Sequence, residues 1–354
     1  MSLIVDIGSY TTKFGEAGSE IPIEFRTCLC TQRYPNSMFA SLGSFQQKQL
    51  KLQQQEQILA SSEYRGLYKM RNVVPDNGRV HSSEDFIKVL NYVKSQFRQQ
   101  IQKITLILPP LTSETVQKQV QQYLFEQINV QEVLISTGGA FALYTTGRTE
   151  GMLLNVGDTT SFVQPVLNNQ SVLDRYQISN IGGRQISQML LKQVYSIQSQ
   201  FGYVSEATGN ESYDLELIYD LKHKLADFSA PANTNVSYEL PDGATMNINR
   251  GSIQNCCNIL FNKEQEQQSL TELIKNSVKE IPTELHHKLY KNLVVSGGST
   301  LINGFGQKLL DELKAQKNTE IEIFGSKNRS IAAFQGASAC AMLSGFAGFY
   351  IRKE

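Results

Sequence analysis

The stretch "LIVDIGSYTTKFGEAG", residues 3–18, decides how the rest of the chain is interpreted. A short apolar run ends in Asp6, and Gly8, several small hydroxyl residues and Lys13 follow. Apolar residues on both sides of a glycine-containing turn are typical of a β-hairpin. Such a turn can hold a phosphate, because consecutive backbone N–H groups point into it and glycine lets the anion come close.

A second stretch, "LLNVGDTTSFVQPV" at residues 153–166, repeats this pattern with Asn155 and Gly157 in place of Asp6 and Gly8. The repeat favours an internal duplication that produces two similar α/β lobes facing each other. Two unrelated hairpins are the alternative, because Gly-Thr turns are common. Two facing turns would clamp a triphosphate from both sides, with a lysine of the first turn as counter-charge and Asp6 holding a hydrated Mg²⁺.

A third stretch, "LVVSGGSTLINGFGQKLLDEL" at residues 293–313, reads as a buried strand, a turn containing Gly297 and Gly298, and a helix. Paired glycines at a strand-to-helix turn allow a flat ring or a phosphate to lie against the backbone. A tight packing turn without a ligand is an equally good interpretation of this stretch alone.

The segments between the hairpins alternate between helix and strand patterns. Residues 82–97 and the segment from Ser113 have a serine cap, an early acidic residue and apolar residues at helical spacing. Residues 104–110 and 132–137 are short apolar runs that predict buried strands. This alternation predicts a sheet flanked by helices.

Two further segments are distinctive. Residues 43–64 contain seven glutamines between positions 46 and 57 and predict a low-complexity surface insert. Residues 238–252, "YELPDGATMNINRGS", predict a hairpin with Asp242 and Gly243 at its turn.

The composition bounds the class of protein. With 354 residues and 40% hydrophobic content, the chain is long enough for two domains. Because 33 basic residues balance 33 acidic ones, bulk charge gives no reason to expect nucleic acid or an acidic membrane surface as a partner. The longest apolar stretch, residues 338–351, is too short to span a bilayer and predicts a buried C-terminal helix. We see no targeting segment at the N-terminus. The five scattered cysteines indicate reduced thiols in a cytosol-like compartment: Cys28, Cys30, Cys256, Cys257 and Cys340.

The three glycine-containing elements, in this order, resemble the actin family, within the ribonuclease H-like fold shared by actin, Hsp70 and sugar kinases. The segments "ALYTTGRTEGMLLNVGD", "IGGRQISQMLLKQ", "YDLKHKL", "YELPDG" and "AAFQGASACAMLSGF" extend the resemblance over nearly the whole chain. The resemblance implies an α/β, actin-like ATPase fold with duplicated lobes and a nucleotide cleft between them.

The same resemblance divides the chain. It implies a first lobe at 1–148, with a small upper subdomain at about 29–71 that contains the glutamine-rich insert and with completion by a C-terminal helix at about 333–354. It implies a second lobe at 149–332, with an upper subdomain at about 182–261.

The resemblance also implies ATP or ADP with Mg²⁺ as the cofactor, and Asp6 as the residue that holds Mg²⁺ through water. The residues that match nucleotide-facing positions are Asp6, Gly8, Ser9, Tyr10, Lys13, Gly157, Asp158, Thr159, Gly183, Lys222, His223, Gly297, Gly298 and Ser299.

The chain departs from the family's catalytic pattern. Tyr10 replaces a loop glycine and His223 replaces a glutamate that faces the ribose. Asn155 stands where the family carries an aspartate, Phe162 where actin has a histidine that orders the attacking water, and Gly138 where actin has the glutamine that positions it. Loss of one such group typically costs about 10²–10⁴ in rate. We therefore expect a pseudo-ATPase that holds a nucleotide, and we assign no catalytic residue.

Residues 251–300 resemble the actin-related proteins at the pointed end of dynactin, the tenth class. The resemblance implies a cytoplasmic, cytoskeletal subunit that caps a short actin-related filament. Its partners would be actin or actin-related subunits and complex-specific proteins, without nucleic acid or membrane insertion. Free polymerisation is not expected, because the glutamine-rich insert replaces actin's flexible loop and the chain ends soon after its last helix. The alternatives are a hydrolysing, filament-forming relative, a sugar-kinase-like enzyme, and a pseudo-ATPase of a ciliary, chromatin or organellar assembly.

Overall fold

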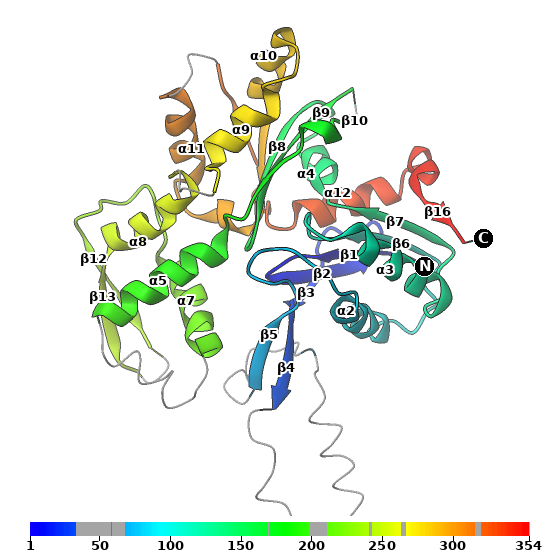
Figure 1. Cartoon of the computed structure of the whole chain (residues 1–354), viewed down its shortest axis with the longest axis horizontal. Helices are drawn as coiled ribbons and strands as arrows, with labels where there is room; N and C mark the ends of the chain where they lie inside the picture. The colour runs from blue at the N-terminus through cyan, green and yellow to red at the C-terminus, as the bar shows by residue number, and fades with distance from the viewer. Residues whose placement is uncertain are drawn as a thin grey trace, which may run out of the picture.

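The structure, a computed structural model, describes residues 1–32, 58, 68–168, 170–197, 211–240, 243–262, 267–315 and 320–353. Two lobes lie side by side, each built on a mixed β-sheet with helices packed against it (Figure 1). The glutamine-rich insert predicted at 43–64 lies outside the described residues, apart from Ile58.

The first sheet has the strand order β16-β7-β6-β1-β2-β3. Its strands are β1 (Ser2–Ile7), β2 (Thr11–Glu16), β3 (Ile23–Arg26), β6 (Lys103–Ile107), β7 (Glu132–Ser136) and β16 (Ile351–Arg352). The hairpin β1–β2 and the edge strand β3 are antiparallel, whereas β6 and β7 run parallel to β1 on its other side.

The second sheet repeats this arrangement in the order β10-β9-β8-β14-β15, with β11 also pairing with β9. Its strands are β8 (Gly151–Val156), β9 (Ser161–Leu167), β10 (Gln170–Ser171), β11 (Gln177–Ser179), β14 (Leu293–Ser296) and β15 (Ile323–Phe324). Again an antiparallel hairpin, β8–β9, begins with the central strand, and two parallel strands lie on its other side. This shared arrangement agrees with the predicted duplication of the lobes.

The central strands are mostly apolar because both faces of each sheet are covered. In β1, Leu3 and Val5 pack into the cluster formed with the outer helices, while Ile4 packs into the cluster on the other face of the sheet, which contains Phe141 and Phe334. In β8, Leu154 and Leu153 divide in the same way. The apolar runs that the sequence shows at these positions are therefore two-sided cores.

Helices cover the outer face of each sheet. In the first lobe these are α2 (Glu84–Ser95) and α3 (Glu114–Glu126), which confirm the helices predicted at 82–97 and from Ser113. Ser113 caps α3, since its side chain accepts a hydrogen bond from the N–H of Val116 at 3.4 Å. The second lobe carries α5 (Gly183–Ile197), α7 (Glu211–Leu225), α8 (Arg250–Cys257), α9 (Leu270–Val278), α10 (Thr283–Lys291) and α11 (Phe305–Lys314).

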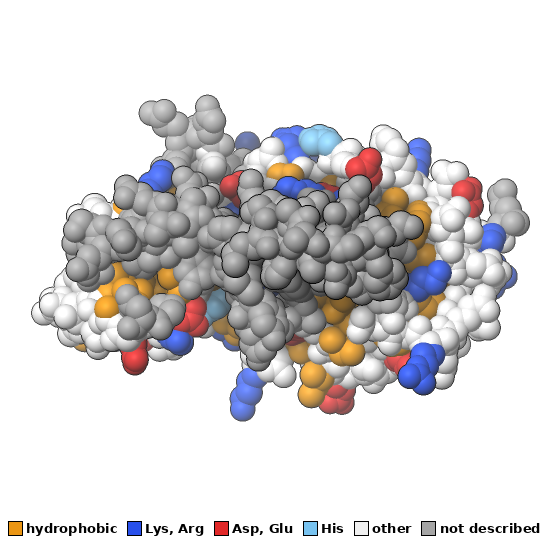
Figure 2. Space-filling model, turned by 90° about the horizontal axis from the view of Figure 1, so that it is seen from below, with side chains coloured by type: hydrophobic (Ala, Val, Ile, Leu, Met, Phe, Trp, Pro, Cys, Tyr) orange, Lys and Arg blue, Asp and Glu red, His pale blue; other side chains and the backbone are white. Residues whose placement is uncertain are grey.

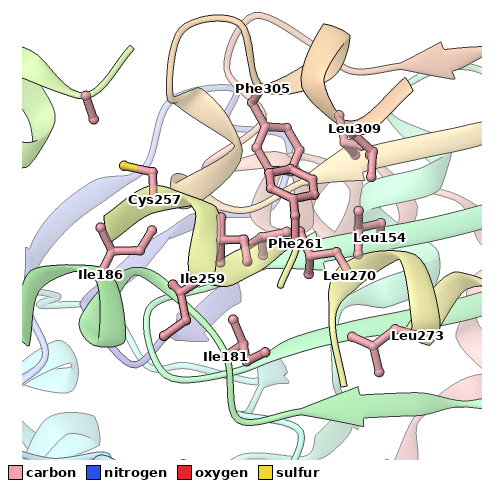
Figure 3. Packing of buried hydrophobic residues seen from close by; sticks show 14 of the residues in the cluster. Leu154, Ile181, Ile186, Cys257, Ile259, Phe261, Leu270, Leu273, Phe305 and Leu309 are labelled. Atoms are coloured by element: carbon pink, nitrogen blue, oxygen red, sulfur yellow. The ribbon is translucent and has the colours of Figure 1, made fainter. Parts of the chain in front are cut away.

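Figure 3 shows part of the core of the second lobe, where residues from several helices meet the sheet. Phe261 and Phe305 have ring centroids 5.8 Å apart, and Leu309 lies beside them. Ile181 and Ile186 approach the same core from the segment that begins α5. This packing fixes the start of α5, which faces the first lobe.

Two helices, α4 (Gly139–Tyr144) and α12 (Ala332–Ala341), lie between the sheets (Figure 1). They pack on each other, with α12 against β1 and α4 against β8. Contact is close because residue 336 is glycine: a Cβ there would lie 1.9 Å from the carbonyl oxygen of Phe141.

The remaining elements are small. Strands β4 (Cys28–Gln32) and β5 (Tyr68–Asn72) form one two-stranded sheet, and β12 (Asn235–Glu239) and β13 (Thr245–Asn249) form another. The latter confirms the hairpin predicted at 238–252, with Gly243 in its turn at a φ of 83°. Asp242 of that turn lies outside the described residues. The short 3₁₀ helices are η3 (Leu173–Arg175), η4 (Asn258–Leu260), η5 (Gly298–Leu301) and η6 (Ser344–Phe349).

The predicted buried helix at 338–351 is wrong in extent. Helix α12 ends at Ala341, and η6 and the short strand β16 follow. The helix ends where Leu343 takes an extended backbone conformation, and Gly345 and Gly348, which follow in η6, disfavour a return to α-helix because glycine lowers helix propensity by about 1 kcal/mol relative to alanine. Met342, Leu343, Phe349 and Ile351 are exposed rather than buried.

All five cysteines are buried free thiols. Within the described ranges, no helix is long and apolar enough to cross a membrane. On the face shown in Figure 2, basic and acidic side chains of the described residues are interspersed, as the balanced composition predicts.

The close approach of α12 to α4 can be tested with two glycine-to-alanine substitutions. We expect Gly336→Ala to lower the unfolding free energy by about 1–3 kcal/mol, because the new methyl group overlaps the backbone of α4. Gly306→Ala in α11 is the matched control: a Cβ there meets nothing within 4 Å, so a gain of up to about 1 kcal/mol is expected. Urea denaturation measures both, and equal effects would contradict the packing described.

Candidate functional site

A cavity of about 580 Å³ lies between the lobes. This volume is within the range of about 300–1,000 Å³ that is usual for ligand pockets. Most of the residues predicted to face a nucleotide line its wall: Asp6, Gly8, Ser9, Tyr10, Lys13, Gly157, Asp158, Lys222, His223, Gly297, Gly298 and Ser299. The other two, Thr159 and Gly183, lie behind the wall rather than on it.

The two hairpin turns have the same internal geometry. The N–H of Gly8 donates to the carbonyl of Thr11 at 3.1 Å, and the N–H of Gly157 donates to the carbonyl of Thr160 at 3.0 Å. A Cβ on either glycine would lie 2.8 Å or 2.9 Å from the accepting oxygen, so only glycine fits. Both turns thus present their backbone to the cavity in the same way.

The first turn carries an ion pair at its base. Asp6 and Lys13 are opposite each other in the hairpin, with Lys13 Nζ 3.8 Å from Asp6 Oδ2. Burial raises the pKa of Asp6, and the neighbouring Lys13 opposes that rise. A buried carboxylate beside an ammonium group supplies both charges that a phosphate and its cation would meet.

The second turn carries no such pair. Asn155 and Phe162 occupy the equivalent opposed positions. The Asn155 side-chain oxygen accepts a hydrogen bond from Ser296 Oγ at 2.9 Å, and Phe162 stacks on Tyr176 with ring centroids 5.2 Å apart. These side chains are therefore engaged in packing and hydrogen bonding, and neither is a proton acceptor at neutral pH.

Gly138 lies at the foot of the cavity as the N-cap of α4. Its φ of 79° is in the left-handed region, and a Cβ would lie 2.9 Å from Ile107 Cγ2 and 3.0 Å from Ala333 Cβ. The neighbouring Gly139 is blocked as well, because its Cβ would lie 1.7 Å from Gln164 Oε1. Neither glycine therefore leaves room for a side chain of its own at this part of the wall.

Arg184, at the start of α5, joins the two lobes. Its side chain is only 1% exposed and contacts Asp158 of its own lobe at 2.8 Å. It also donates to three acceptors of the first lobe: the Ser9 carbonyl at 3.1 Å, the Val74 carbonyl at 3.0 Å and Asp76 Oδ1 at 2.8 Å. One buried guanidinium thus connects both turns.

A second connection between the lobes involves Arg26, the last residue of β3. Arg26 pairs with Glu216 of α7 at 2.5 Å. Its guanidinium lies over the ring of Tyr10, 3.8 Å from the centroid, and Tyr10 in turn contacts Tyr219 at 4.8 Å between centroids. Tyr10, which departs from the family pattern, therefore fills space on the wall rather than opening it.

Lys222 of α7 is the second buried ammonium group at the cavity. Its Nζ donates to the Gly183 carbonyl at 2.7 Å and to Ser187 Oγ at 2.9 Å, and burial lowers its pKa to about 8. Burial, together with the charge of Lys222, also lowers the pKa of His223. Residue 183 is glycine because a Cβ there would lie 2.7 Å from Ser299 Oγ and 3.0 Å from Lys222 Nζ.

The site fits Mg²⁺ only together with a phosphate ligand. Among the residues that the structure describes, no group of three or more His, Cys, Asp or Glu side chains could hold a metal ion. Mg²⁺ commonly binds through one or two carboxylates, water and substrate phosphates. Asp6 supplies one carboxylate of that kind, whereas Asn155 supplies only an amide oxygen, already bonded to Ser296.

Chemically, the arrangement can bind a polyanion. Two glycine turns offer backbone donors, and Lys13 and Lys222 offer positive charge.

Three residues beside the site are not predicted from the sequence: Arg184, Arg26 and Glu216. Arg184 follows a pair of glycines at a helix start, which was a usable signal, but nothing in the sequence showed which acceptors it reaches.

Arg184 can be tested by substitution. We expect Arg184→Met to lower the unfolding free energy by about 3–5 kcal/mol, because Asp158 is left as a buried charge without its cation. The control is Arg352→Met, whose ion pair with Glu132 involves a side chain that is 77% exposed and should change stability by less than about 1 kcal/mol. Similar losses in the two variants, measured by urea denaturation, would show that Arg184 does not join the lobes as described.

Lys222 gives the stability a defined pH dependence. Its pKa is about 8 in the folded protein, against an ordinary value of 10.5. The unfolded chain therefore binds more protons between these values, so this lysine makes the unfolding free energy rise with pH, by at most about 1.4 kcal/mol per unit. We expect Lys222→Met to lose this rise and Lys224→Met, whose side chain is 61% exposed, to keep it. Denaturation at about pH 7.5 and about pH 10 measures it, and an unchanged slope in Lys222→Met would refute this assignment.

Comparison with known proteins places these features in context. The family model described as Actin matches residues 1–354. The chain is 28% identical to Centractin of Schizosaccharomyces pombe over 373 residues, covering 99% of this chain and 93% of that protein. It is also 28% identical over 370 residues to a protein named Actin-like protein of Neurospora crassa, with the same two coverages.

Proposed function

Because the chain belongs to the actin family, we propose that it binds an adenine nucleotide between its lobes without hydrolysing it, and serves as a structural subunit of an assembly of actin-related proteins. The observation that carries this proposal is the contrast between the two turns. The backbone geometry that grips phosphate is the same in both, whereas the acid and its partner are present only in the first.

Nucleotide binding is supported by the wall of the cavity. The phosphates would meet the Gly8 and Gly157 turns, with Lys13 and Lys222 as counter-charges, and the Gly297–Gly298 turn would leave a flat surface for the nucleoside. A ligand held by both lobes stabilises their closed arrangement by mass action and needs no turnover to do so. Mg²⁺, carried by the phosphates, would neutralise part of their charge near Asp6.

The absence of hydrolysis is supported at three positions. Attack of water on a phosphoryl group needs a residue that orients the water and accepts its proton. Asn155, Phe162 and Gly138 stand where the family carries such residues, and none of the three can accept a proton. With about 10²–10⁴ in rate lost for each missing group, turnover should be negligible.

The assembly role is supported by the family and by the two relatives, Centractin and the Actin-like protein. We propose that the subunit caps the pointed end of a short actin-related filament, as in dynactin, because residues 251–300 resemble that class. Its partners would then be actin or actin-related subunits and proteins specific to the complex, at the cytoskeleton.

Two measurements on the purified chain test this proposal. We expect extraction followed by mass spectrometry to find adenine nucleotide bound in about equimolar amount, because the Gly8 turn, Lys13 and Lys222 line the same cavity. Phosphate release from added ATP should not exceed the no-protein background, with conventional actin as the positive control. Phosphate release at the rate of actin would sink the pseudo-ATPase assignment.

The assembly role has its own test. Affinity purification of the tagged chain from its own cells should recover actin-related filament subunits in fixed ratio. Recovery of a ciliary, chromatin or organellar complex in their place would remove the capping role and leave nucleotide binding untouched.

A further inference from the structure

The contact between the two turns narrows the choice of ligand. Resting on the proposed nucleotide binding, we infer that the cleft accepts a nucleoside diphosphate and disfavours the triphosphate, because Thr159 closes the space between the turns. The relevant residues are the second position of the first turn, Ser9, and the third position of the second turn, Thr159.

Ser9 and Thr159 are bonded to each other. The Ser9 Oγ and Thr159 Oγ1 atoms lie 2.7 Å apart, across the boundary between the lobes. Thr159 is fully buried and absent from the cavity wall, although Asp158 and Thr160 on either side of it line that wall. The cavity therefore ends at this hydrogen bond.

The surroundings hold this contact in place. Arg184 donates to the Ser9 carbonyl and pairs with Asp158, so it fixes both turns from one side. Behind Thr159 lies Gly78, where a Cβ would come within 3.4 Å of Thr159 Oγ1 and 2.4 Å of Thr160 Cγ2. Thr159 thus has backbone behind it and Ser9 in front of it.

A phosphoryl group gripped by both turns must enter this space. An oxygen that accepts hydrogen bonds from both hydroxyls, each about 2.7–2.8 Å long, would hold them roughly 4–5 Å apart. The turns would therefore have to separate by about 2 Å from the observed 2.7 Å, breaking the Ser9–Thr159 bond and displacing the Arg184–Ser9 bond. To bind a triphosphate, the protein would therefore have to move its two turns apart by this distance to admit the third phosphate.

A diphosphate makes no such demand. The residues that line the cavity include Asp6, Ser9 and Lys13 of the first hairpin together with Lys222 and Gly298 of the second lobe. Two phosphates held by the first turn and Lys13 leave the nucleoside to extend towards Lys222 and the Gly298 turn. The closed contact and a bound diphosphate are therefore compatible.

The test compares ADP and ATP, both with Mg²⁺, on full-length protein stripped of nucleotide, by isothermal titration calorimetry. We expect wild type to bind ADP about tenfold or more tightly than ATP, since two hydrogen bonds of about 1 kcal/mol each must break for the triphosphate. Thr159→Gly removes both the hydroxyl and the methyl group, so its ATP affinity should rise about tenfold while its ADP affinity changes little. Thr159→Ser keeps the bond to Ser9 and should keep the preference for ADP.

The outcomes separate the two proposals. ATP binding as tight as ADP binding in the wild type overturns the inference and leaves nucleotide binding intact. Binding of neither nucleotide overturns the proposed function, and the inference with it. If Thr159→Gly does not fold, Ser9→Ala provides a second variant, in which the bond is absent and the ADP:ATP affinity ratio should fall; an unchanged ratio there would also overturn the inference.

Discussion

The arrangement of the two lobes depends on one buried guanidinium. Arg184 reaches from the start of α5 into the first lobe, where backbone carbonyls and a carboxylate surround it, while Asp158 balances its charge from behind. A charge this deeply buried is tolerated only when nearly every donor has a partner, so the positions of both turns are constrained together. The Arg26–Glu216 pair adds a second link between the lobes. The cleft is therefore a defined space, set by contacts between lobes rather than by either lobe alone.

Anion binding and water activation depend on different parts of the two hairpins. Binding an anion in such a turn depends on backbone geometry, and that geometry is the same at Gly8 and Gly157. Activating a water molecule is a side-chain property, and it changes with single substitutions. In the second hairpin an amide and an aromatic ring face each other where the first hairpin has an ion pair. The two halves of the molecule therefore keep one shape but differ in chemistry.

Much of the fold was predictable from the sequence because its signals are local. Hairpin turns, apolar strands and the Ser113 cap each depend on a few adjacent residues, and the family resemblance placed the predicted site residues around one cavity. What could not be predicted depends on distant partners. The first-lobe acceptors of Arg184 lie more than 100 residues away in the sequence. Thr159, predicted to face the nucleotide, is instead buried behind the cavity wall, between Gly78 and Ser9. The helix predicted at 338–351 is too long because small apolar residues there satisfy a helical pattern, whereas the observed helix ends at Ala341.

The left-handed conformation of Gly138, beside the cavity, limits which side chains this position can acquire. At position 138 any other residue would strain the backbone and press against Ile107 and Ala333. A longer side chain at this position would therefore require the β6 strand and the α12 helix to yield space first. Several coordinated changes would be needed, and each intermediate would be less stable than the protein from which it arose. The packing around position 138 therefore opposes the gain of a side chain there.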